Sequence, residues 1–114
     1  MSIDEFKKFG IDVPKEGKFI IVLCSKWCSS CKLLSNILEK FRDQGIIKMK
    51  EIDIDKGAGL AGRFNINALP ALLFFKDGKL LDKDIIVNGE KLVNEGVMIG
   101  SFDKIILKEL IRKM

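Results

Sequence analysis

The sequence has no histidine, only three cysteines among its 114 residues, and no long apolar segment. A structural zinc site needs four ligands, so these cysteines would have to recruit a carboxylate or a second chain. The longest apolar runs, 19–24 and 68–75, are far too short to span a bilayer. Lysine and arginine number 20 against 16 aspartates and glutamates, without the basic block typical of nucleic-acid binding. We therefore expect neither a membrane span nor a nucleic-acid partner.

The first eight residues are polar and charged, and they lack the apolar core and cleavage site of a secretory signal. A cytoplasmic location is expected, unless a leader has been removed. Structural disulfides are rare in the reducing cytosol, so a C-x-x-C pattern there indicates redox or metal chemistry. The length and the balance of 47% hydrophobic to 32% charged residues predict one globular domain over 1–114.

Hydrophobic periodicity predicts strands and helices that alternate at first and end in a group of strands before a last helix. The predicted elements are a helix over 3–9, a strand over 19–23, a helix over 29–44, a strand over 46–53, a helix over 57–64, a strand over 71–75, its partner over 79–87, a short strand within 92–99, and a helix capped by Ser101 that runs to Lys113. Strand–helix–strand order favours a parallel pair, and the Asp77-Gly78 turn adds antiparallel strands. We predict an α/β fold with a mixed central sheet and helices on both faces.

The two longest predicted helices each carry an apolar stripe that can pack on the sheet. The helix that begins at Ser29 ends at Gly45, a residue type that favours the position after a helix. The stripes consist of Leu33, Leu34, Ile37, Leu38 and Phe41 in this helix, and of Phe102, Ile105, Ile106 and Leu110 in the last one.

The motif Trp27-Cys28-Ser29-Ser30-Cys31 lies where the first strand gives way to a helix. Free N–H groups and the helix dipole stabilise an anion there, so we expect the pKa of Cys28 to lie below that of a free thiol. Cys31 is one turn further in, and the spacing lets the two sulfurs close a small ring. Such a pair suits thiol–disulfide exchange, in which Cys28 attacks a substrate disulfide and Cys31 resolves the mixed disulfide. Trp27 would provide a flat apolar surface beside the nucleophile.

This motif, together with Leu69-Pro70 at the head of a later strand and the following F-F-K-D-G, resembles the thioredoxin family over about Phe19 to Gly78. The resemblance implies a thioredoxin fold in which a cis Leu69–Pro70 peptide faces Cys28 and the Leu69 backbone pairs with the substrate peptide. It also implies a reductase of protein disulfides that needs no bound cofactor. Electrons would come from a flavin-dependent or ferredoxin-dependent reductase, and we expect a monomer.

The sequence departs from the family pattern at the site itself. Ser29-Ser30 replaces the usual Gly-Pro, a pair that sets the redox poise, and Asn36 replaces a helix proline. Val22 stands at the family's buried aspartate, which removes the expected proton acceptor for Cys31, and Glu51 stands at the family's partner lysine. We hypothesise that Glu51 is the substitute carboxylate, partly buried below Cys31, and takes its proton. The alternative is an ordinary exposed or ion-paired carboxylate on a strand.

Cys24 allows a second interpretation of the cysteines. The spacing Cys24-x₃-Cys28-x₂-Cys31 is that with which radical-SAM enzymes hold an iron–sulfur cluster, although those enzymes need a much longer barrel. Otherwise, Cys24 is either a small buried residue at a strand end or a third thiol that can form an off-path disulfide.

Residues 78–100 form a longer stretch than the family's usual hairpin. We predict an extra strand or a partner-specific lobe between the last hairpin and the C-terminal helix. This region and the missing aspartate motivate the alternative function, a binding or scaffold module with weak redox turnover. An oxidase or isomerase is a third candidate, which the absence of an export signal disfavours.

Overall fold

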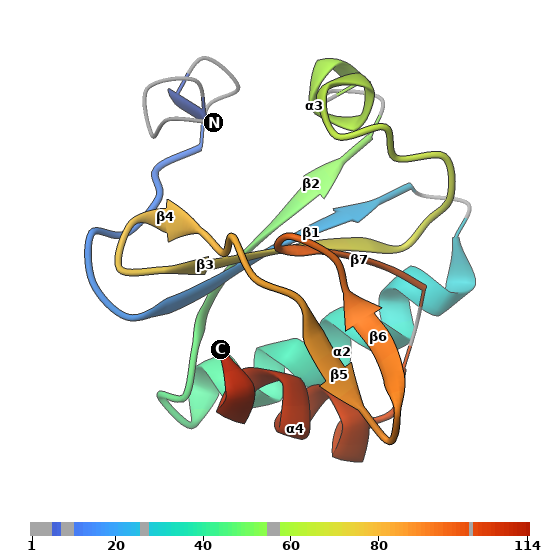
Figure 1. Ribbon diagram of the computed structural model, residues 1–114. Helices are drawn as coiled ribbons and strands as arrows, with labels where there is room; N and C mark the ends of the chain where they lie inside the picture. Colours follow the sequence, from blue (N-terminus) through green and yellow to red (C-terminus); the bar gives the residue numbers. More distant parts are fainter. Residues whose placement is uncertain (1–5, 8–10, 26–27, 55–57, 101) are drawn as a thin grey trace.

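The computed structural model describes residues 6–7, 11–25, 28–54, 58–100 and 102–114. Its central element is the strand β1 (Lys18–Cys24), in which every residue after Lys18 is buried. The strand lies in the middle of the sheet, with neighbours along both edges and covering layers on both faces (Figure 1). An unbroken apolar sequence suits this position, because neither face of the strand meets water.

The main sheet is mixed and has five strands within the described residues. On one side of β1 lies β2 (Lys48–Asp53), which runs parallel to it. On the other side lies β3 (Ala71–Lys76), which is antiparallel to β1. Both β4 (Lys79–Leu80) and β7 (Val97–Ile99) pair antiparallel with β3. The predicted combination of parallel and antiparallel strands is therefore confirmed.

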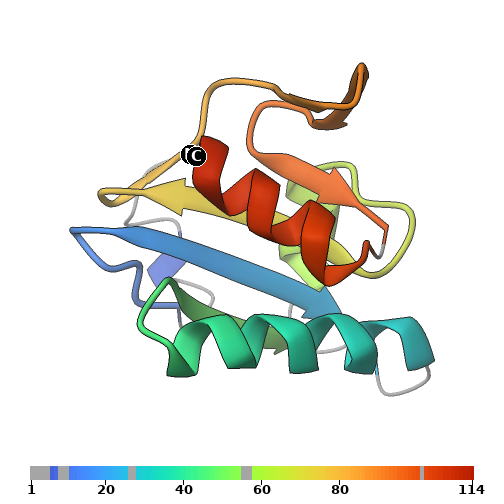
Figure 2. The ribbon, with the colours of Figure 1, turned by 90° about the horizontal axis from the view of Figure 1, so that it is seen from below.

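The helices α2 (Ser29–Asp43) and α4 (Lys104–Lys113) cover one face of this sheet (Figures 1 and 2). The helix α3 (Ala58–Arg63) lies on the opposite side (Figure 1). Side chains of β1 alternate between the two layers, since Ile20 and Val22 pack with α2 and α4 while Phe19 and Ile21 pack on the other face. The predicted arrangement of helices on both faces is confirmed.

The opposite face is closed by aromatic side chains from distant parts of the chain. Phe6, which is helical together with Lys7, packs edge-on against Phe75 with ring centroids 4.9 Å apart. The same ring stacks near Phe64, which follows α3. Most of the helix predicted over 3–9 lies outside the described residues.

The chain between β4 and α4 differs from the prediction. The strand expected over 79–87 is wrong, because β4 ends at Leu80 and β5 (Ile85–Val87) belongs to a separate two-stranded sheet with β6 (Glu90–Val93). Three exposed charged residues at 82–84 carry the chain away from the sheet, and Asp84 Oδ1 accepts a hydrogen bond from the Glu95 N–H at 2.9 Å. The single strand expected within 92–99 is divided, and only β7 returns to β3.

The last helix begins later and faces another way than predicted. Its cap is Asp103, whose Oδ1 accepts a hydrogen bond from the Ile106 N–H at 2.9 Å, whereas Ser101 lies outside the described residues. Ile105 is 78% exposed, and the buried face comprises Leu107, Leu110 and Ile111. The predicted stripe of this helix is therefore wrong at Ile105.

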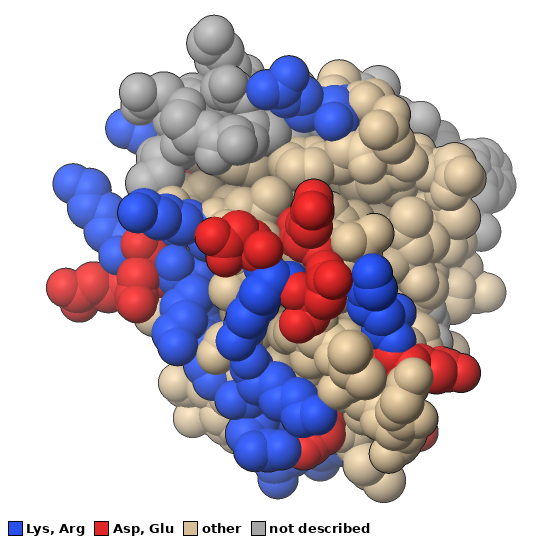
Figure 3. Space-filling view, viewed as in Figure 1, with Lys and Arg blue, Asp and Glu red and all other residues tan. Residues whose placement is uncertain are grey.

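Basic side chains gather around the C-terminal end of α4 (Figure 3). Lys18, Lys76 and Lys83 each donate a hydrogen bond to a carbonyl of residues 111–114. Cations at this end of a helix offset its partial negative charge. Burial, with smaller contributions from Lys76 and Lys83, holds the pKa of Lys18 below its usual value.

Gly96 offers a test of how β7 is brought back to the sheet. It has a φ of +85°, and an added Cβ would lie 2.6 Å from the Leu81 carbonyl oxygen. We expect Gly96→Ala to lower the free energy of unfolding by about 3 kcal/mol, through backbone strain and this clash. Gly89→Ala is the matched control, since its φ is +80° but no atom lies within 4 Å of the added Cβ, and about 1 kcal/mol is expected. Equal losses in urea unfolding would show that the close approach to Leu81 has no energetic effect.

Candidate active site

Cys28 is the N-cap residue of α2, with extended backbone angles of φ −96° and ψ 101°. Its side chain is partly exposed, and its Sγ lies 3.4 Å from the Ser30 hydroxyl oxygen. Hydrogen bonds lower the pKa of the Cys28 thiol, first from the Cys31 thiol, then from the Ser30 hydroxyl and from the backbone N–H groups of both residues. The predicted direction of this shift is confirmed, and it favours a reactive thiolate.

Cys31 has the opposite environment, because its side chain is only 2% exposed. Burial raises the pKa of the Cys31 thiol strongly, and hydrogen bonds with the thiols of Cys28 and Cys24 raise it further. Cys31 therefore remains protonated and can donate its S–H to the Cys28 thiolate. The first turn of α2 thus holds a partly exposed cysteine with a lowered pKa and a buried cysteine with a raised one, and Cys24, Cys28 and Cys31 are all free cysteines.

The peptide bond between Leu69 and Pro70 is cis, as predicted. Leu69 and Cys28 line the same cavity of about 440 Å³, together with Ser25, Ile54 and residues 66–68. Pro70 is buried at the entry to β3, and its carbonyl accepts a hydrogen bond from the Gly100 N–H at 2.8 Å. The fold thus brings the predicted platform to the predicted nucleophile, although the two lie far apart in the chain. Trp27 lies outside the described residues.

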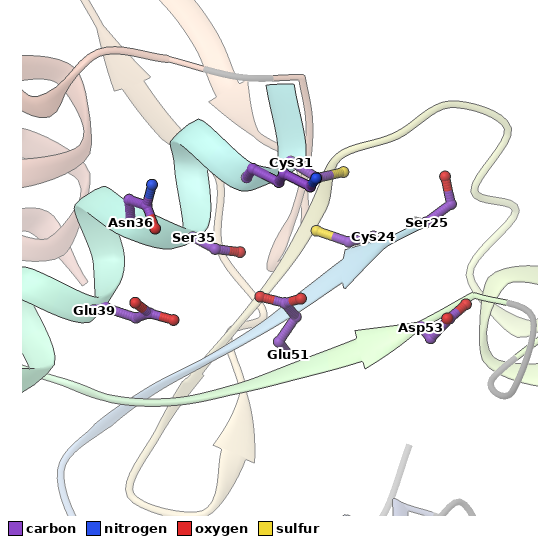
Figure 4. A pocket seen from close by; sticks show the side chains of 9 residues that line it. Cys24, Ser25, Cys31, Ser35, Asn36, Glu39, Glu51 and Asp53 are labelled. Atoms are coloured by element: carbon purple, nitrogen blue, oxygen red, sulfur yellow. The ribbon is translucent and has the colours of Figure 1, made fainter. Parts of the chain in front are cut away.

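Glu51 lies on β2 directly beside Val22 of β1, and it lines a second cavity of about 350 Å³ with Cys31 and Cys24 (Figure 4). Its carboxylate is turned towards α2, but its side chain is exposed. The expectation that Glu51 is partly buried is therefore wrong, because β2 is an edge strand whose outer positions meet solvent. Its proximity to Cys31 at one cavity is as expected, and its negative charge contributes to raising the pKa of Cys24.

Ser35 is a site residue that the sequence analysis missed. It is 4% exposed, whereas Leu33, which was assigned to the buried stripe of α2, is 65% exposed. Ser35 lines the second cavity one helical turn after Cys31. The spacing i, i+4 places two side chains on one helix face, so Cys31 itself was the signal that Ser35 would face inward.

Among the described residues, no group of three or more histidines, cysteines or carboxylates is placed to hold a metal ion. Likewise, no helix in the described ranges is long and apolar enough to cross a membrane.

The sequence model of the thioredoxin family matches residues 2–95. The chain belongs to the thioredoxin family. A thioredoxin of Coprinus comatus is 30% identical over 91 residues, which cover 76% of this chain and 82% of that protein. The mitochondrial thioredoxin of Mus musculus is 31% identical over 80 residues, or 68% of this chain and 48% of that longer protein.

Solved structures of thioredoxins share the fold. Oxidised mitochondrial thioredoxin 3 of Saccharomyces cerevisiae superposes with a TM-score of 0.67 at 20% identity, over 99% of this chain and 91% of that one. A mutant thioredoxin from Halobacterium salinarum gives 0.67 at 22% identity, over 86% and 74%. Membership of the thioredoxin family supports a thiol–disulfide oxidoreductase activity at the level of the family.

Ser30 allows the local origin of the Cys28 thiolate to be tested. Ser30→Ala removes a hydroxyl that lowers the pKa of Cys28, so we expect that pKa to rise. The pH at which iodoacetamide alkylates Cys28 at half its maximal rate should rise accordingly. Ser29→Ala is the matched control, because the neighbouring Ser29 side chain is exposed. An unchanged alkylation profile for Ser30→Ala would contradict the role of its hydroxyl.

Proposed function

We propose that this thioredoxin-family protein reduces protein disulfides, with Cys28 as the nucleophile and Cys31 as the resolving thiol. The observation that carries the proposal is the placement of the two cysteines. Cys28 is partly exposed at the start of α2 and lines a cavity with Leu69, whereas Cys31 is buried one turn further on. Their pKa values are shifted in opposite directions. A lowered pKa suits the thiol that attacks the substrate first. A buried, protonated partner does not react until the mixed disulfide has formed.

The chemistry takes two exchange steps. The Cys28 thiolate attacks one sulfur of the substrate disulfide, forms a mixed disulfide and releases the other substrate sulfur as a thiolate. Cys31 then loses its proton and attacks the Cys28 sulfur, which releases the second substrate thiolate and leaves a Cys28–Cys31 disulfide. Two electrons pass to the substrate, and the two substrate thiolates take up protons.

The cavity that Cys28 shares with Leu69 is the proposed substrate site. A peptide seated there would lie along the Leu69 backbone beside cis Pro70, close to the attacking sulfur. Trp27 would provide a flat apolar surface beside the nucleophile, as its place in the motif implies.

Glu51 is the proposed acceptor of the Cys31 proton. Val22 is fully buried and offers no acceptor, whereas the carboxylate next to it in the sheet lines the same cavity as Cys31. Because Glu51 is exposed, a proton taken from Cys31 can pass on to solvent after each turnover.

Oxidised protein would be reduced again by a flavin-dependent or ferredoxin-dependent reductase, so that no bound cofactor is needed. We further propose that residues 1–114 act as one monomeric domain in the cytoplasm. Mitochondrial thioredoxins are among the relatives, so localisation of the tagged protein by microscopy decides the compartment.

The division of labour between the cysteines can be tested by insulin reduction with dithiothreitol. Cys28→Ser should reduce the rate to the background given by dithiothreitol alone, because it removes the attacking thiolate. Cys31→Ser should instead accumulate a covalent mixed disulfide with insulin, visible by mass spectrometry. A wild-type protein without activity above background would favour the alternative, a binding or scaffold module of the same fold.

The role of Glu51 can be tested through the pH dependence of the same reaction. Glu51→Gln should slow resolution of the mixed disulfide and change the pH profile of the rate, because the cavity loses its proton acceptor. Glu39→Gln is the matched control, since Glu39 lines the same cavity from α2. The hypothesis is wrong if both variants keep the wild-type pH profile.

A further inference from the structure

Cys31 contacts two thiols rather than one. Its side chain packs in one buried cluster with Cys24, at the end of β1, and with Cys28, at the start of α2. Cys24 and Cys31 also line the same cavity, and the Cys24 thiol contributes to raising the pKa of Cys31. Cys24 is 5% exposed and Cys31 is 2% exposed, so this second pair is buried. The two-cysteine mechanism makes no use of Cys24, although its thiol lines the same cavity as Cys31.

The cavity beside the buried pair also holds a buried hydroxyl group. Ser35 lines this cavity, and its side chain is buried. Its hydroxyl has no hydrogen-bond partner of standard geometry among the described residues. Figure 4 shows it directed into the space between Cys24 and Glu51. It lies close enough to Cys24 to lower the pKa of that thiol, although burial outweighs this and raises the pKa overall.

The two cavities separate the three thiols by function. Cys28 lines the cavity with Leu69, where the substrate is proposed to lie, whereas Cys24 and Cys31 line the cavity with Glu51. A disulfide between Cys24 and Cys31 would therefore form away from the substrate platform, next to a carboxylate and a hydroxyl that can handle a proton.

We propose that Cys24 is a second resolving thiol, which converts the Cys28–Cys31 disulfide into a buried Cys24–Cys31 disulfide and sets Cys28 free. This inference rests on the proposed function, since it begins from the disulfide that substrate reduction produces. Oxidised protein would then exist as two isomers, with the disulfide facing either the substrate or the second cavity.

The exchange is balanced within the molecule. Cys24 gives its proton to the Glu51 carboxylate and attacks the sulfur of Cys31 as a thiolate. The Cys24–Cys31 bond forms, the Cys28–Cys31 bond breaks, and Cys28 leaves with the electron pair. One disulfide is present before and after the step, so neither an oxidant nor a reductant is required.

The identity of the leaving group favours this direction. Disulfide exchange runs towards release of the thiol that is the more stable thiolate, and the hydrogen bonds from Ser30 and the start of α2 stabilise Cys28 in that form. Cys28 is thereby set free at the cavity with Leu69, while the disulfide lies at the cavity with Glu51. The second isomer stabilises the oxidised protein and therefore lowers its reduction potential. A reductase that attacks the Cys28–Cys31 disulfide must also wait for the reverse exchange.

The test asks which cysteine is free in the oxidised wild-type protein. The protein is oxidised with diamide, its remaining thiol is blocked with N-ethylmaleimide in acid denaturant to prevent scrambling, and it is digested with trypsin. Cleavage after Lys18, Lys26 and Lys32 separates Cys24, in peptide 19–26, from the other two cysteines, in peptide 27–32. We expect label on Cys28 and a disulfide that links the two peptides through Cys31.

Label confined to Cys24, with the whole disulfide inside peptide 27–32, would overturn the proposal and leave insulin reduction by Cys28 and Cys31 untouched. Cys24→Ala is the matched control and must show only the disulfide within peptide 27–32. Its reduction potential should lie above that of wild type, by about 30 mV if the buried isomer is favoured tenfold. Equal potentials would also contradict the proposal.

Cys28→Ser tests the geometry directly, because only Cys24 and Cys31 remain. On oxidation with diamide this variant should lose both thiols without forming dimers, through an internal disulfide between β1 and α2. If both thiols stay titratable, or if only dimers form, the two sulfurs cannot pair and the proposal fails, whatever the wild-type activity.

Discussion

The contact between the Cys28 and Cys31 thiols across the first turn of α2 is the interaction on which the site depends. It exists because β1, which is buried along both faces, delivers the motif to one end of the sheet. Leu34 and Leu38 then pack α2 against that sheet, so that its inward face carries Cys31 into the core. One thiol is left at an exposed helix start, where an anion is stable, and the other where an anion is costly. The different reactivities of Cys28 and Cys31 thus follow from the way α2 packs against β1.

Much of this could be predicted from local sequence. An apolar run such as 19–23 has few places to lie except the middle of a sheet, and a C-x-x-C motif at its end falls on the next helix. The failures share one cause. In α4, the apolar residues Ile105, Ile106, Leu107, Leu110 and Ile111 allow more than one buried face, and only docking against the sheet and β5 decides that Ile105 faces solvent. The pairing of β7 with β3 likewise depends on contacts far apart in sequence, which no local pattern encodes.

Two departures from the family pattern, Val22 on β1 in place of an aspartate and Glu51 on β2 in place of a lysine, change the site without changing the fold. An apolar residue at Val22 suits a position with no exposure and needs no hydrogen bonds, whereas a carboxylate there would have to be desolvated. Glu51, one strand away, keeps a carboxylate at the same cavity but in contact with water. The sequence alone showed both departures from the family pattern. It could not show that Glu51 is exposed, because that depends on β2 lying at the edge of the sheet.

The same geometry explains why a third thiol matters here. A cysteine at the end of a buried strand is ordinarily inert, because burial keeps it protonated. Cys24, however, lies against Cys31, which must become oxidised in every catalytic cycle of the proposed mechanism. Once Cys31 carries a disulfide, the relevant property of Cys24 is its distance from that sulfur, and its resting reactivity matters less. The thiol at the helix start is then the group released. The Ser30 hydroxyl and the backbone N–H groups there, which help to make Cys28 a good nucleophile, also make it a good leaving group.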